Sequence, residues 1–222
     1  MMAGLVLPSS ATAQNVLDGA YISFGINRDF VNYDMGGNNS FGPHSNEDEE
    51  NGVAGISGTV ALGKANLIQF GNGSIRAEIE YSNLEAQEIS TASFPGLPDP
   101  EFFYETEIDR TQALTLNTWY DFALPSNEKV VLSLGAGLGA AKLSASTDDT
   151  VVAGSAEDTG FAYMIGAEAN YLVTPQIALG LGVRYSNYGS LDIPLEDGDA
   201  GSLTIDQDAY QIRAGVRFTF GG

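Results

Sequence analysis

The chain of 222 residues contains no cysteine and a single histidine. Without thiols it can form no disulfide scaffold and carry out no thiolate chemistry. Catalysis by a Ser–His or Cys–His arrangement would depend on His44 alone. His44 lies in an acidic, Gly/Asn-rich stretch with no nucleophile pattern nearby. We therefore expect His44 to be a solvated surface residue and the protein not to be an enzyme.

Long hydrophobic runs are also missing. No stretch approaches 18 uncharged apolar residues, and the longest smooth run, 130–141, is short and rich in glycine. A membrane-spanning helix needs about 20 such residues, so none is predicted. This absence does not exclude a membrane, because a β-barrel spreads its lipid-facing surface over many strands.

The N-terminus has part of a secretory signal. Residues 11–13, Ala-Thr-Ala, fit the small-x-small cleavage pattern, but the basic region is missing and the apolar core is short. We predict a truncated signal peptide over 1–13 and a single barrel domain over 14–222. The alternative is an unstructured N-terminus.

The segment 210–220 alternates strictly between apolar and polar residues. Its polar positions include Arg213 and Arg217, and its length is that of a tilted strand crossing a bilayer, about 9–11 residues. A soluble lipocalin-like carrier would have an apolar interior. Inward arginines instead favour a polar lumen with an apolar face toward lipid.

Seven further segments have strand character, and the connections between the eight strands alternate between long and short. The short connections are predicted at 64–73, 123–129 and 173–175, and Asn72-Gly73 is a hairpin signal that could carry the second strand through Phe70. We predict an all-β fold, an eight-stranded antiparallel up-and-down transmembrane β-barrel with long extracellular loops and short periplasmic turns. The predicted strands are 19–31, 53–63, 74–84, 111–122, 130–143, 161–172, 176–187 and 210–220.

Aromatic residues of the outward parity lie at strand ends, where a bilayer favours amphipathic rings. Core aromatics would instead gather at strand middles. We predict one girdle at each membrane interface. The periplasmic girdle consists of Tyr120, Phe122, Tyr171, Phe218 and Phe220, and the extracellular girdle of Tyr81, Phe161, Tyr163, Tyr185 and Tyr210.

The inward parity carries four bases and four acids. An eight-stranded barrel has room inside only for side chains, and an unpaired buried charge is costly, so we expect an ionic network that plugs the lumen. The alternative is a charged constriction that selects small solutes. Acid–base work by Glu78 and Glu80 is less favoured than ion pairing, because arginines share their face. The predicted network is Arg76, Glu78, Glu80, Asp121, Glu168, Arg184, Arg213 and Arg217. The inward glycines of 135–139 would make room for these charges.

The predicted loops are almost purely acidic. The net charge is −20, and 22 of the 29 acids lie in 32–52, 85–110, 144–160 and 188–209, where Arg110 is the one base. Such a surface repels nucleic acid and attracts basic partners or divalent cations. A metal site of His44 with Glu47, Asp48, Glu49 and Glu50 is a weak alternative to a solvated charge run. No cofactor is predicted beyond divalent cations at these loops.

Three segments carry a resemblance to a known family. Residues 161–185, the run Asn-Thr-Trp-Tyr-Asp-Phe at 117–122 and the final strand resemble the opacity-type outer-membrane β-barrels, small barrels of the OmpA and OmpX type. The resemblance implies residence in the outer membrane of a Gram-negative bacterium, in contact with lipid and lipopolysaccharide. It implies a role in adhesion or envelope integrity through an unknown extracellular ligand, and recognition of Phe220 by the barrel assembly machinery. Gly221 and Gly222 after Phe220 depart from that pattern.

Overall fold

The computed structural model describes residues 18–39, 42–45, 50–92, 103–124, 126–148, 153–195 and 201–221. No helix in these ranges is long and apolar enough to cross a membrane. Ten strands make up the fold. They are β1 (Ala20–Asn39), β2 (Gly42–Ser45), β3 (Glu50–Phe70), β4 (Gly73–Leu84), β5 (Gln87–Ala92), β6 (Phe103–Leu124), β7 (Asn127–Asp148), β8 (Ala153–Leu172), β9 (Ile177–Leu195) and β10 (Gly201–Thr219).

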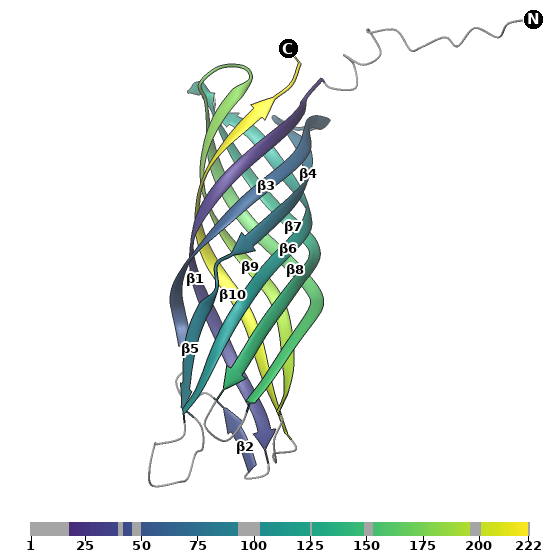
Figure 1. The fold of residues 1–222 in the computed structure, drawn as a ribbon. Coiled ribbons are helices and arrows are strands. Elements are labelled where there is room, and N and C mark those ends of the chain that lie inside the picture. The colour runs from purple at the N-terminus through teal and green to yellow at the C-terminus, as the bar shows by residue number, and fades with distance from the viewer. Residues whose placement is uncertain are drawn as a thin grey trace, which may run out of the picture.

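The strands form one antiparallel sheet that closes on itself. Its order is β10-β9-β8-β7-β6-β4-β3-β1-β2, and β1 pairs with β10 from Tyr21–Thr219 to Asn38–Ser202. Figure 1 shows a tall barrel of tilted strands in which β1 begins and β10 ends at the same end of the barrel. The predicted all-β barrel is therefore confirmed. Its wall has eight members, because β4 and β5 follow one another along β6 and β2 is a short hairpin partner of β1.

Short turns lie at the end of the barrel where β1 begins and β10 ends, which we call the short-turn end. β3 runs through Phe70 as the hairpin signal indicated, and Gly71 and Asn72 alone connect it to β4; Gly71 has a φ of 58°. The predicted strand stopped at residue 63 because the ladder shifts register between Lys64 and Ile68, where Asn66 has a φ of 55°. Such a bulge breaks the period-two pattern on which the prediction relied.

At the opposite end the strands are longer than predicted, and the connections are correspondingly shorter. β1 continues to Asn39 and β9 to Leu195, so most described acids of the predicted long loops lie on strands. These segments keep a period-two pattern of their own, with Leu191 and Ile193 facing inward and Asp192 outward. We call this part the strand extension; it comprises the described residues of 31–56, 84–113, 141–162 and 188–209.

The strand extension has the form of two facing sheets. The β8–β9 ladder ends at Tyr163–Asn187 and the β3–β4 ladder at Ser57–Leu84, while β5 pairs with β6. Beyond these points the described ladders join β5-β6-β7-β8 on one side and β9-β10-β1-β3 on the other. Apolar side chains of both sheets form one buried core. It includes Val31, Tyr33, Met35, Leu84, Ile89, Ile108, Leu143, Leu191, Ile193, Leu195, Leu203 and Ile205.

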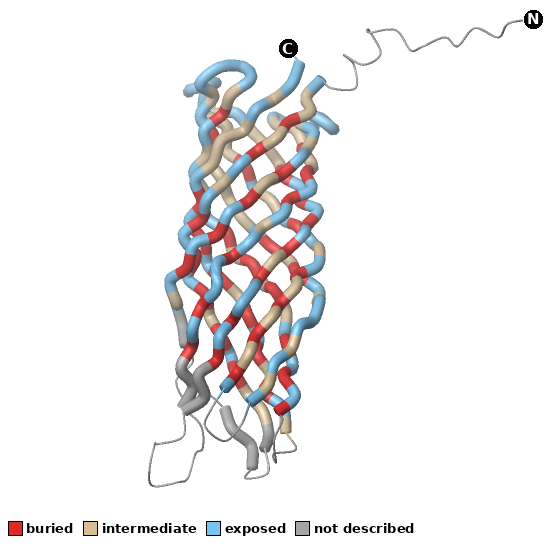
Figure 2. The backbone as a smooth tube through the Cα atoms, in the orientation of Figure 1, coloured by how far each residue is buried: buried red, intermediate tan, exposed pale blue. Residues whose placement is uncertain are grey.

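Nearer the short-turn end, the outer face is apolar and the inner face polar. Large side chains such as Leu62, Leu138 and Leu181 are exposed on the wall, and along β4 the exposed Ile79 and Tyr81 alternate with the buried Glu78 and Glu80. Figure 2 shows this alternation of exposed and buried positions around the wall. The pattern is the inverse of a soluble protein and is typical of a wall that faces lipid.

Glycines of β7 make room for inward side chains of β6. A Cβ at Gly135 would overlap the Trp119 ring, and one at Gly137 would overlap the Asn117 side chain. Both neighbours are buried, Trp119 with 1% of its surface exposed. The prediction that these glycines accommodate lumen charges is thus corrected, because uncharged Trp119 and Asn117 occupy the space.

Replacing Gly135 by Ala should destabilise the barrel by about 1–3 kcal/mol, because the new methyl group forces the packed Trp119 ring to move. Gly58 provides a matched control: it faces outward on β3, and a Cβ there would meet no atom within 4 Å. Gly58→Ala should change stability by less than about 0.5 kcal/mol. Urea unfolding in lipid vesicles, followed through Trp119 fluorescence, measures both, and equal effects would contradict this packing.

Candidate functional site: the charged lumen

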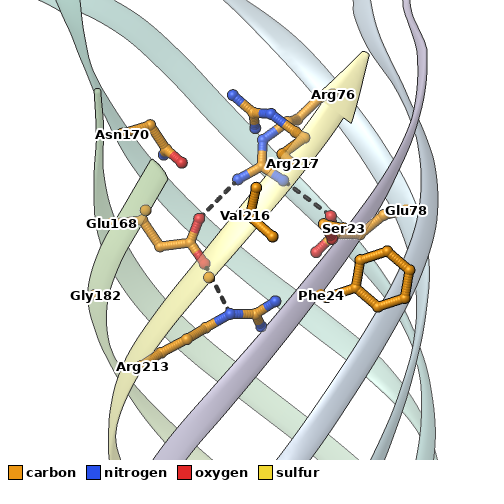
Figure 3. A pocket seen from close by; sticks show the side chains of 12 residues that line it. Ser23, Phe24, Arg76, Glu78, Glu168, Asn170, Gly182, Arg213, Val216 and Arg217 are labelled. Atoms are coloured by element: carbon orange, nitrogen blue, oxygen red, sulfur yellow. Dashed lines mark hydrogen bonds and ion pairs between the residues drawn. The ribbon is translucent and has the colours of Figure 1, made fainter. Parts of the chain in front are cut away.

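The lumen is crossed by a connected set of ion pairs centred on Arg76 of β4. Its guanidinium contacts three carboxylates, with Nη1 at 2.9 Å from Glu78 Oε2, Nε at 3.0 Å from Asp121 and Nη2 at 3.1 Å from Glu168 Oε2. The register of the sheet produces this cluster, because Arg76 and Glu78 share the inner face of β4 while Asp121 and Glu168 face inward from β6 and β8. Figure 3 shows Arg76 between Glu78 and Glu168.

Glu80 forms the second centre of the network. It accepts hydrogen bonds from Arg184 of β9 and from Arg213 of β10, the latter at 2.5 Å. Nε of Arg213 also lies 3.7 Å from Glu168 Oε1, which joins the two centres. Glu80 is 2% exposed, so each guanidinium neutralises a charge that has lost nearly all of its hydration.

Aromatic side chains complete the network. Tyr21 Oη donates a 2.6 Å hydrogen bond to Glu78 Oε2, and Trp119 Nε1 donates one of 2.9 Å to Glu78 Oε1. The Arg76 guanidinium lies 4.7 Å from the centre of a Trp119 ring, a cation–π contact. The sequence reasoning missed both aromatic residues, although each shares the inward parity of its strand.

Seven of the eight predicted lumen charges are joined in this way, and the eighth is not. Among the described residues, Arg217 forms no ion pair; its guanidinium lies 5.5 Å from the Tyr21 ring. A fifth inward acid, Asp29, was also missed. It accepts hydrogen bonds from Ser57 and Gln211 and forms a second polar layer between the ion pairs and the apolar core of the strand extension.

The lumen is filled by these layers. Two cavities border the network, one of about 30 Å³ and one of about 10 Å³. They share no lining residue: Arg76 and Glu168 line the first, and Glu80 and Arg184 the second. A single water needs about 10–15 Å³ of such space, so both cavities are of the size of one or a few waters.

The predicted girdle residues lie on the outer wall in ring-to-ring contact. Near the strand extension, Phe161, Tyr163, Tyr185 and Tyr210 form a continuous row across β8, β9 and β10, with neighbouring ring centres 5.2–6.2 Å apart. At the short-turn end, Tyr120 stacks on Phe122 at 5.8 Å. Phe70, which was not among the predicted girdle residues, packs edge-on against Tyr120. The other predicted girdle residues, Tyr81, Tyr171, Phe218 and Phe220, are all exposed on the wall.

The outer surface of the strand extension is acidic. Asp34 and Asp206 are cross-strand partners on β1 and β10, and Glu88 and Glu107 are partners on β5 and β6. All four side chains are exposed. Burial and the charges of Asp34 and Asp192 raise the pKa of the Asp206 carboxyl above its usual range. Like charges placed directly opposite one another destabilise a sheet, so these acidic pairs lower the stability of the strand extension.

The weak metal site cannot be placed. Glu47, Asp48 and Glu49 lie outside the described residues, and His44 and Glu50 are described as strand backbone only. Within the described ranges, no three His, Asp or Glu side chains are grouped closely enough to hold a metal ion. The predicted signal peptide also lies outside the described residues.

Comparison with known proteins agrees with this geometry. Residues 1–218 match the family described as outer membrane protein beta-barrel domain. Comparison with curated protein sequences gave no match.

Among solved structures, the chain is similar to Neisserial surface protein A, with 18% identity, a TM-score of 0.50, and coverage of 91% of this chain and 98% of that one. A major outer membrane protein from Thermus thermophilus has 13% identity, a TM-score of 0.52 and coverage of 90% and 99%. The attachment invasion locus protein Ail of Yersinia pestis has 15% identity, a TM-score of 0.45 and coverage of 90% and 99%. At these identities the likeness concerns the fold alone.

Replacing Glu80 by Gln should lower the free energy of unfolding by about 3–5 kcal/mol, because two buried guanidinium groups would lose their counter-charge. Glu157→Gln is the matched control. The ion pair of Glu157 with Lys142, 2.7 Å long, is exposed on the wall, and exposed pairs contribute about 0–1 kcal/mol. Urea titration of both variants in lipid vesicles measures the difference. Equal destabilisation of the two variants would show that the buried network contributes no more to the free energy of unfolding than an exposed ion pair.

Proposed function

The chain belongs to the outer-membrane β-barrel family, and from this premise we propose that it is a non-enzymatic surface protein that acts through the acidic strand extension. Its place is the outer membrane of a Gram-negative bacterium. In barrels of this kind the short turns face the periplasm, so the strand extension stands on the extracellular side. A role in adhesion or envelope integrity fits a protein whose exposed chemistry lies outside the cell.

The filled lumen is the observation that carries the proposal. The ion pairs of Arg76 and Glu80 occupy one level, the Asp29 layer the next, and the apolar core the strand extension. Each buried charge of the two centres has a partner in place, which supports a structural role for the network as a plug. A molecule with a plugged interior interacts with its surroundings through its outer surface.

The charge of that surface defines the partner. The exposed described acids of the strand extension are accompanied there by two bases, Arg110 and Lys142, and Lys142 is already paired with Glu157. A field of one sign attracts basic partners and repels nucleic acid. The exposed acids are Asp34, Glu85, Glu88, Glu107, Asp109, Asp148, Glu157, Asp158, Asp192 and Asp206.

Two further partners belong to the proposal. The ring row from Phe161 to Tyr210 would lie at the headgroup level of the outer leaflet and contact lipopolysaccharide. Phe220 at the end of β10 would be the residue that the barrel assembly machinery reads. Its backbone already closes the ring, because Phe220 N donates a 2.7 Å hydrogen bond to Ala20 O.

A narrow channel for small solutes is the alternative, and conductance separates it from a plugged barrel. In planar bilayers the wild-type protein should show no voltage-dependent conductance, because paired charges fill the lumen. A channel would conduct, and its conductance would change in Arg213→Ala or Arg217→Ala. Conduction by the wild type would therefore overturn the plug.

A hexalysine peptide tests the acidic surface directly. It should bind the barrel in lipid nanodiscs at low salt, and the double variant Glu88→Gln/Glu107→Gln should bind about two- to tenfold more weakly, since exposed ion pairs contribute about 0.2–1 kcal/mol each. Glu128→Gln, an exposed acid at the short-turn end, is the control and should bind as the wild type does. Binding that survives 1 M salt, where the Debye length is about 3 Å, would contradict an electrostatic contact.

A further inference from the structure

A cavity lies on the short-turn side of the ion-pair network. Its volume is about 30 Å³, and Arg217 stands at its edge beyond the Arg76 guanidinium (Figure 3). Arg217 is half-buried, so the cavity can be reached from the short-turn end, while the network closes its other side. The polar side chains that line it are Ser23, Arg76, Glu78, Glu168, Asn170, Arg213 and Arg217.

The carboxylates near this cavity are already engaged. Oε1 of Glu78 accepts from Trp119 at 2.9 Å and from Asn117 at 3.4 Å, and Oε2 accepts from Tyr21 and Arg76. Glu168 has one oxygen at 3.1 Å from Arg76 and the other at 3.7 Å from Arg213. Glu78 therefore accepts four hydrogen bonds, and the charge of Glu168 is shared between the guanidinium groups of Arg76 and Arg213.

Two donors at the cavity have no acceptor in the part of the chain that the structure describes. Arg217 forms no ion pair there, although its guanidinium carries a full charge and five N–H groups. The buried hydroxyl of Ser23 has no hydrogen-bond partner among the same residues. A buried polar group without a partner costs about 1–3 kcal/mol, so an acceptor supplied from outside would be favoured here.

We propose that this cavity is a binding site for a small monovalent anion, a halide or a single carboxylate, held by Arg217 and Ser23. A negative ligand offers the accepting oxygen or halide that both donors lack, and charge-assisted hydrogen bonds of this kind are about twice as strong as neutral ones. The volume holds roughly two waters. It fits a chloride or a carboxylate group.

The cavity is closed on its inner side and is not part of a conduction path. An anion would enter from the short-turn side and stop at Arg76 and Arg213, whose guanidinium groups are held by Glu78, Glu168 and Glu80. The inference is thus independent of the proposed role of the strand extension at the other end. Failure of the barrel to bind hexalysine would not affect the proposed anion site, and failure to bind an anion would not affect the proposed role of the strand extension.

Chloride titration of the purified barrel in detergent micelles, followed by chloride NMR line broadening, tests the site. The wild type should show broadening that saturates and that acetate displaces at constant ionic strength. Arg217→Gln should weaken binding about tenfold or more, because it removes the charged donor. Ser23→Ala should weaken it several-fold. Arg28→Gln, which removes an exposed arginine of β1 far from the lumen, should change nothing.

The outcomes decide the proposal. Broadening that rises without saturation in the wild type, or equal broadening in the wild type and Arg217→Gln, would overturn it and leave a cavity filled with water. Heat-modifiable gel mobility shows that each variant is folded before titration. If Arg217→Gln does not fold, Ser23→Ala decides, because it removes one hydroxyl and leaves every ion pair in place.

Discussion

The contact of Arg76 with three carboxylates is the interaction on which the rest of the barrel depends. Glu78 lies on β4 beside Arg76, Asp121 comes from the neighbouring β6 and Glu168 from β8, so one guanidinium joins the inner faces of three strands, of which β8 does not pair with the other two. Eight strands leave room inside for side chains only. Once a charge is placed in that space, its partner must be placed as well, and the register of each neighbouring strand is constrained by the need to deliver it.

The two halves of the molecule solve the same packing problem with opposite chemistry. At the level of the lipid, the outer wall is apolar and the inside is ionic; in the strand extension, the outer wall is acidic and the inside is apolar. The change occurs near Asp29 and Gln211, whose polar layer separates the two interiors. Charged side chains are therefore buried where the wall faces lipid, and apolar side chains are buried where it faces water. The boundary between the two parts coincides with the row of rings from Phe161 to Tyr210.

Period-two alternation was sufficient to predict the wall, because lipid on one side and packed charge on the other leave no ambiguity about parity. It predicted the inward placement of Arg76, Glu80 and Arg213 and the outward placement of Tyr185 and Tyr210. It could not predict pairing, which is why Arg217 was counted with the network although it stands apart. It also ended the strands too early. In Leu191-Asp192-Ile193 the apolar side chains point inward and the acid outward, as in a soluble sheet, whereas the prediction looked for strands with their apolar side chains toward lipid. The bulge at Asn66 shows the same limit, because one extra residue breaks the pattern while the strand continues.

The two ends of the described ladders, at Tyr163–Asn187 and Ser57–Leu84, have a mechanical consequence. Up to that level the backbone hydrogen bonds between neighbouring strands join the wall into a closed ring. Beyond it the wall consists of two sheets joined by the apolar core and by side-chain hydrogen bonds such as Tyr33–Gln87 and Thr111–Gln207, together with one backbone bond from Glu85 N to Ile56 O. The closed ladder therefore holds the part of the barrel with the ionic interior, while the strand extension depends on contacts between the side chains of its two sheets.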